Sequence, residues 1–103
     1  MALRLQKEMV VSQGAGAGVS VGTGEFSRVA VYYQLDTGQP PVAGTVQVQI
    51  SADDTFWVDE GAALTDEGFI EVTKPCLFVR INTTVAMTGG STRAILIGQY
   101  GNN

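Results

Sequence analysis

The side chains best able to carry out chemistry in this sequence are acidic. Three acidic doublets fall within fifteen positions, at residues 53–54, 59–60 and 66–67. A converging pair of carboxylates can act as general acid and base in glycoside hydrolysis, or can bind calcium. Adjacent residues of an extended chain point to opposite faces, so a doublet could converge only in a turn. The D-x-D-G spacing of a calcium loop is missing around Asp53 and Asp54, which favours turn capping and leaves calcium as the lesser alternative.

Composition limits the other kinds of active site. The chain has no histidine, which excludes Ser-His-Asp and Cys-His mechanisms within one chain and removes the commonest ligand of transition metals. Its single cysteine, Cys76, has no intrachain disulfide partner. The surrounding sequence KPCLFVRI favours Cys76 as a small buried hydrophobic residue, and Lys74 nearby leaves a reactive thiolate as the alternative. We therefore expect no enzymatic activity, no bound metal and no cofactor.

The elements that position the acidic residues are predicted to be strands. Residues 46–50 alternate apolar and polar side chains, the period of a strand with one buried face. Residues 51–54 are turn formers, and residues 55–58 are strand formers that carry the chain back. The first doublet is therefore predicted to cap a hairpin turn by accepting backbone N–H bonds.

Further strands are predicted at residues 26–35, 69–72, 74–85 and 93–100. In the first of these, Val29, Val31 and Tyr33 share one face, and the strand at 74–85 is apolar on both faces, as a central strand would be. Gly89 and Gly90 are predicted to close a hairpin between the last two strands. About seven strands joined by short turns predict an all-β fold, a single-domain antiparallel β-sandwich of jelly-roll or immunoglobulin-like type.

The length and net charge of the chain limit its number of domains and the kinds of partner that it can bind. A chain of 103 residues is one domain with one core. The formal net charge is −4 with only 6 basic residues, which argues against a nucleic-acid partner. No run of 18 apolar residues and no secretory signal pattern is visible, so we expect no membrane association.

The N-terminal quarter differs from the rest. We divide the chain into an N-terminal arm or edge strand with a glycine-rich linker at residues 1–25 and a sandwich domain at residues 26–103. Glycine-rich sequence gives little side-chain packing and suits a hinge. One hypothesis is that the apolar residues before it pack onto another chain, either a sister subunit or a larger assembly; the alternative is that they form the first strand of their own sandwich. The residues concerned are Leu3, Leu5, Met9, Val10 and Val11.

Three stretches carry a resemblance to a known type of protein. They are QISADDTFW, GFIEVTKPCLFVRINTT and TGGSTRAILIG, which together cover roughly residues 44–99. This order resembles the small β-sandwich of bacteriophage virion proteins, in which a serine-plus-acid turn precedes an aromatic residue and a proline leads into a long strand. The matching residues are Ser51, Asp53, Asp54 and Trp57 in the turn, Pro75, Phe78, Val79, Arg80 and Asn82 in the long strand, and Gly89 and Gly90.

The resemblance implies a capsid decoration or cement protein. Such a protein would bind the major capsid protein on the outside of an assembled head, as a homo-oligomer and most simply a trimer. It would be made in the host cytoplasm and reside on the virion surface.

An alternative function is a receptor- or carbohydrate-binding module of a fibre or tail. That function would use Phe56, Trp57 and Tyr32, with Tyr33, as stacking surfaces. For Trp57, packing in the core is a simpler role than sugar stacking. For Arg80, a structural role is simpler than ligand binding: its stem would lie over a sheet edge, and its guanidinium would donate to a carboxylate or to loop carbonyls. A carboxylate-pair enzyme ranks third, because so small a sandwich offers little room for a cleft.

Overall fold

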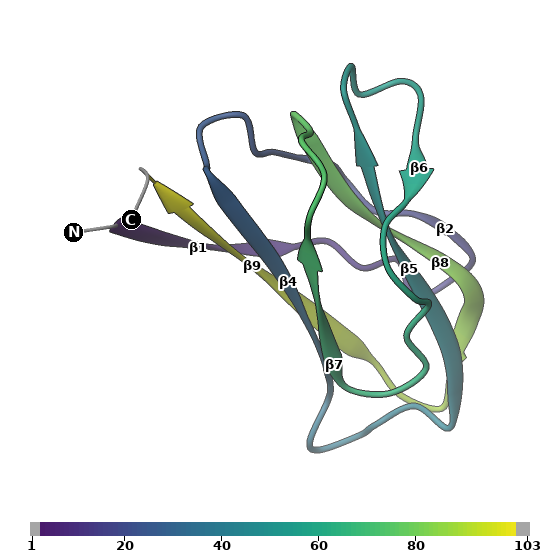
Figure 1. The fold of residues 1–103 in the computed structure, drawn as a ribbon. Coiled ribbons are helices and arrows are strands. Elements are labelled where there is room, and N and C mark those ends of the chain that lie inside the picture. Colours follow the sequence, from purple (N-terminus) through teal and green to yellow (C-terminus); the bar gives the residue numbers. More distant parts are fainter. Residues whose placement is uncertain (1–2, 101–103) are drawn as a thin grey trace.

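The computed structural model describes residues 3–100, which form two packed antiparallel sheets (Figure 1). Within this range the chain makes nine strands and no helix long and apolar enough to span a lipid bilayer. The prediction of an all-β, single-domain antiparallel sandwich is confirmed.

One sheet has four strands in the order β1-β9-β4-β7. These strands are β1 (Leu3–Met9), β9 (Thr92–Tyr100), β4 (Arg28–Leu35) and β7 (Gly68–Val72). The other sheet has the order β2-β8-β5-β6, and β3 also pairs with β8. Its strands are β2 (Gly16–Ala17), β3 (Val21–Gly22), β8 (Phe78–Thr88), β5 (Ala43–Ser51) and β6 (Val58–Asp59). Strand β8 is central in its sheet, as its two apolar faces predicted.

The core lies between the two sheets and is built by alternation along the strands. Every second residue of β4 from Val29 to Tyr33 is buried, as is every second residue at the centres of β5, β8 and β9. The face predicted for residues 26–35 is therefore the buried one. The buried apolar set is Met9, Val29, Val31, Tyr33, Val46, Val48, Ile50, Val79, Ile81, Ala94 and Leu96.

Residues 3–25 belong to the sandwich. Strand β1 pairs with β9 along its whole length, and β2 and β3 both pair with β8. The side chain of Met9 is 4% exposed and lies in the core. The intrinsic first strand, one of the two alternatives, is thus the arrangement observed.

Two predicted strand connections differ from the structure. Gly89 and Gly90 close no hairpin, because β8 and β9 lie in different sheets and the glycines carry the chain from one to the other. Gly90 is required there for packing: a Cβ at this position would lie 2.2 Å from the carbonyl oxygen of Gln39. The returning strand predicted at residues 55–58 is shorter and later, since β6 contains only Val58–Asp59.

The turn after β5 is capped by Asp53 and Ser51, so the predicted capping is found at the first aspartate of the doublet. The Asp53 carboxylate accepts the backbone N–H groups of Thr55 and Phe56, each at 3.0 Å. The Ser51 hydroxyl accepts the N–H groups of Asp53 and Asp54. Asp54 has a φ of 64°, a left-handed conformation that aspartate tolerates better than most residues. The doublet Asp53–Asp54 therefore lies in the turn of a hairpin, in which β6 pairs back onto β5.

Candidate functional site

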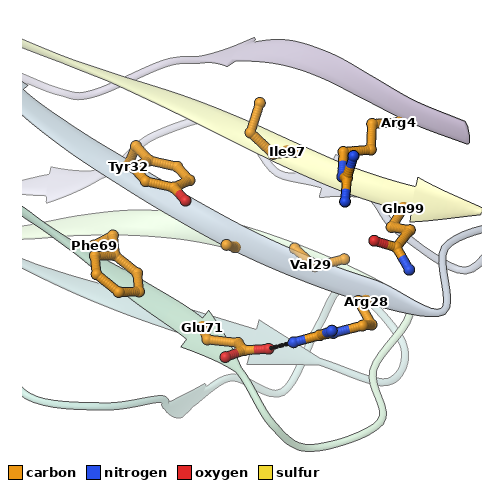
Figure 2. Close-up of a pocket in the computed structure, with 9 residues that line it drawn as sticks. Arg4, Arg28, Val29, Tyr32, Phe69, Glu71, Ile97 and Gln99 are labelled. Carbon is orange, nitrogen blue, oxygen red and sulfur yellow. Dashed lines mark hydrogen bonds and ion pairs between the residues drawn. The ribbon is translucent and has the colours of Figure 1, made fainter. Parts of the chain in front are cut away.

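The four-stranded sheet has aromatic and charged side chains on the side that faces away from the core, and we call this side the outer face (Figure 2). Strand registers fix its side chains in rows, because residues directly opposite each other in an antiparallel sheet share a face. One row holds Glu8, Ile95, Tyr32 and Phe69 from four different strands. The neighbouring row holds Gln6, Ile97, Ala30 and Glu71, and the next holds Arg4, Gln99 and Arg28.

Two aromatic rings form the most exposed apolar part of the outer face. Tyr32 of β4 and Phe69 of β7 are directly paired in register. Their ring centroids lie 5.4 Å apart with an interplanar angle of 21°, which is a stacked arrangement. The two residues are 43% and 58% exposed, so much of each ring remains in contact with water. Such a pair supplies contact area at little entropic cost to a partner.

Charged residues lie beside the aromatic pair. Arg28 donates from Nη2 to Glu71 Oε2 at 2.5 Å, the bond drawn in Figure 2. The hydrogen bond and the negative charge of Glu71 raise the pKa of Arg28. Arg4 lies on the same face beyond Gln99 and forms no ion pair with any residue from 3 to 100. The face thus combines arginines with aromatic residues, the types enriched in protein interfaces.

The hollow on the outer face is shallow. Arg4, Arg28, Tyr32, Phe69 and Glu71 surround a depression of about 230 Å³. A site that encloses a small molecule is normally larger and buries most of its ligand. This geometry suits a broad contact with another macromolecule better than catalysis on a small substrate.

The aromatic residues predicted for surface recognition do not form one surface. Tyr32 lies on the outer face, whereas Phe56 and Trp57 lie in the β5–β6 hairpin of the other sheet. Phe56 is 72% exposed, and Trp57 is half-buried. Tyr33 points into the core, where its hydroxyl donates to Met87 Sδ, and burial raises its pKa. Tyr33 is therefore excluded as a stacking surface.

Arg80 has a structural role, with partners other than those predicted. Its Nε donates to the side-chain oxygen of Gln49 at 2.9 Å, in place of a carboxylate or loop carbonyl. Its guanidinium lies over the ring of Trp57, 4.2 Å from the centroid. Trp57 thus packs against the outer surface of the five-stranded sheet, and its predicted core position is wrong.

The acidic doublets are held apart. Glu60 is buried and accepts bonds from Thr73 N at 2.7 Å and from Lys74 Nζ at 2.9 Å. Burial raises the pKa of Glu60, but the Lys74 ammonium and the Thr73 bonds outweigh burial and leave the pKa below its usual value. Its neighbour Asp59 instead accepts from Gln49. Among residues 3–100, no group of three or more Cys, Asp or Glu side chains is arranged to hold a metal ion.

The residues predicted to contact a capsid or sister subunit differ in burial, and only Leu3, Leu5 and Met9 belong to β1. Met9 is in the core and Val11 packs against it, whereas Val10 and Leu5 are partly or largely exposed. The side chain of Leu3 lies outside what the structure describes. Cys76 is half-buried against the core, with its Sγ 3.7 Å from Thr23 Oγ1.

Sequence reasoning found Tyr32 and missed its partners. Phe69, Arg28 and Glu71 are exposed residues of β4 and β7, where Arg28 precedes a buried residue and the other two alternate with half-buried ones. One sequence signal could have revealed this surface: the stretch RAILIG has apolar residues on both faces of its strand. In the structure Leu96 is in the core, whereas Ile95 and Ile97 are half-buried and lie on the outer face. Such a run indicates a surface that is apolar without facing the core.

The chain shares its fold with a protein of known structure. It superposes on the crystal structure of the SPBc2 prophage-derived protein YomS with a TM-score of 0.77 and 9% sequence identity. The match covers 96% of this chain and 95% of that chain, so the likeness includes β1 and the glycine-rich segment. Comparison of the sequence with protein-family models and with curated proteins finds no match.

Proposed function

We propose that this chain is a bacteriophage structural protein that binds the outside of an assembled capsid and stabilises it. The single observation that carries the proposal is the shared fold with a prophage-derived protein over nearly the whole of both chains. The virion-type motifs at the β5 turn and in β8 point the same way. In this role the protein would be made in the host cytoplasm and reside on the capsid surface of the virion.

The outer face is the surface that we propose to contact the major capsid protein. Its central aromatic pair, Tyr32 and Phe69, can be desolvated by a partner, and the arginines at its border can pair with acidic groups. The sandwich supplies a rigid platform, because the side chains on the opposite side of β4 and β9 are fixed in the core. A rigid aromatic surface loses little conformational entropy on binding.

Co-sedimentation with capsids assembled without the protein tests this function. We expect saturable pelleting of the wild-type chain, with a stoichiometry that matches a set of symmetry-related positions. Tyr32→Ala and Phe69→Ala should each weaken binding about tenfold or more, because truncating an interface aromatic commonly costs more than 1 kcal/mol. Phe56→Ala is the matched control, an exposed aromatic residue on the other sheet, and should bind normally. A wild-type chain that stays in the supernatant at all concentrations would sink the proposal.

A second candidate function rests on Phe56. This ring is the most exposed aromatic side chain in the described residues and lies in the β5–β6 connection. Such a ring could bind a sugar by stacking in a fibre or tail module. Binding to immobilised bacterial surface glycans that is lost in Phe56→Ala and kept in Tyr32→Ala would favour this function over capsid binding.

A further inference from the structure

Strand β1 has an unpaired edge. Among residues 3–100 it is the outermost strand of its sheet, seven residues long, and pairs with β9 on one side only (Figure 1). Every second residue of β1 therefore directs its backbone N–H and C=O away from the sheet. At the opposite edge, β7 has five residues, and its Ile70 side chain packs closely against Gly61 of the preceding connection. The β1 edge is the longer and more open of the two.

The charges of β1 are self-complementary. Arg4, Gln6 and Glu8 share the outer face, because each lies opposite an outer-face residue of β9. If a second copy of β1 runs antiparallel to the first with Gln6 opposite Gln6, Arg4 of each copy lies opposite Glu8 of the other. Opposite charges on directly facing residues stabilise a strand pair, and like charges destabilise it. The two-fold arrangement provides two such ion pairs.

These charges are available for the second copy. Arg4 forms no ion pair within residues 3–100, and the Glu8 side chain is 69% exposed. Glu8 reaches Arg93 only at 3.9 Å, a long contact between two exposed side chains, which contributes little to stability.

Other registers are less favourable. Centring the pair on Lys7 places two lysines opposite each other, and centring it on Leu5 leaves Arg4 opposite Gln6 with no ion pair. Shifting the register of the two β1 strands by one residue would place core-facing residues of one copy opposite outer-face residues of the other. One sandwich would then be inverted relative to the other. With Gln6 at the centre, Leu5 of one copy lies opposite Lys7 of the other on the core side, where the lysine stem can cover Leu5, now 37% exposed.

We propose that two copies of this chain associate through β1 edges, with Gln6 on the two-fold axis, to form one continuous eight-stranded sheet. The interface is isologous, so each Arg4 pairs with the partner's Glu8. The dimer places the two outer faces side by side on one surface. It rests on the geometry of β1 and not on capsid binding, so the two proposals can fail separately. It also competes with the trimer expected from the sequence resemblance.

Charge swaps at positions 4 and 8 test the pairing by sedimentation equilibrium. The wild-type chain should show twice the chain mass of 10.8 kDa at high micromolar concentration. Glu8→Arg places arginines opposite each other, and Arg4→Glu places glutamates opposite each other, so each single variant should raise the dimer dissociation constant about tenfold or more. The double variant R4E/E8R should restore the dimer. An equimolar mixture of the two single variants should form a heterodimer, since every facing pair is then complementary.

Two controls separate this pairing from general effects of charge. Arg93→Gln removes the weak contact with Glu8 within the chain but leaves the β1 edge unchanged, and it should remain dimeric. Asp66→Arg makes the same change of charge as Glu8→Arg at an exposed position far from β1 in sequence, and it should also remain dimeric.

The outcomes that overturn the proposal are definite. A wild-type monomer at high micromolar concentration would mean that the charges of β1 keep the edge from pairing. A trimer mass, or Glu8→Arg associating as tightly as the wild type, would exclude the two-fold register. Failure of the single variants to form a heterodimer, with each of them folded by circular dichroism, would do the same.

Discussion

The guanidinium of Arg80 lies over the indole ring of Trp57, with 4.2 Å between the guanidinium carbon and the ring centroid. Gln49 fixes the other side of this cluster, since its side chain accepts from Arg80 and donates to Asp59 of β6. The contact therefore ties the β5–β6 hairpin to the central strand β8. It explains how a tryptophan outside the core is kept half-buried.

Replacing Arg80 should expose Trp57 and loosen the hairpin. We expect Arg80→Ala to lower the free energy of unfolding by about 1–2 kcal/mol, the sum of one cation–π contact and one hydrogen bond. Trp57 is the only tryptophan of the chain, so its emission should shift to longer wavelength in the folded variant. Arg28→Ala, which removes an arginine from the opposite sheet, should leave the emission unchanged. An unaltered spectrum in Arg80→Ala would contradict the stacking.

Protonation of Glu60 should lower the free energy of unfolding in acid. The folded-state pKa of Glu60 lies below its ordinary value of 4.5, so its contribution is fully present above that pH and is lost as pH falls through the lower folded pKa. Glu60→Gln should cost about 2 kcal/mol at pH 7, because a charged hydrogen bond to Lys74 is lost. The cost should shrink toward pH 3 in denaturant titrations. An equal cost of Glu60→Gln at both pH values would be inconsistent with this role.

Gly98 should tolerate no side chain, because Phe26 occupies the space. A Cβ on Gly98 would lie 2.5 Å from the Phe26 ring. We expect Gly98→Ala to destabilise the fold by about 1–3 kcal/mol through overpacking. Phe26→Leu in the same chain should recover part of that loss, since the smaller side chain can move away. Gly22→Ala is the matched control, a strand glycine whose Cβ would meet nothing within 4 Å, and chemical denaturation should find it near neutral.

Neighbouring residues at the end of β1 should differ sharply in their effect on stability. Met9→Ala removes a buried side chain and should lower the free energy of unfolding by about 2–4 kcal/mol. Val10→Ala changes a side chain that is 52% exposed and should cost less than about 0.5 kcal/mol. Equal small effects in thermal unfolding would mean that β1 is not part of the folded core in solution.

Local pattern determined most of the strands of this protein. The alternation at residues 26–35 placed Val29, Val31 and Tyr33 on one face, because the two-residue period of a strand is a local property, and in the structure that shared face is the buried one. The turn after β5 was equally predictable, since Ser51 and Asp53 bond to backbone groups two or three residues away. In both cases the interacting atoms are close in sequence.

Pairing between distant strands was decided by the tertiary structure alone. Gly89 and Gly90 have the composition of a hairpin turn, yet they join two sheets, because β9 finds its partners in β1 and β4. Tyr32 meets Phe69 only through the β4–β7 register, and Trp57 meets Arg80 only because β6 folds back onto β5 beside β8. A period of two tells which face a side chain occupies and nothing about which strand lies beside it. That choice depends on the packing of the whole core, so the outer face and the free β1 edge became visible only in the folded chain.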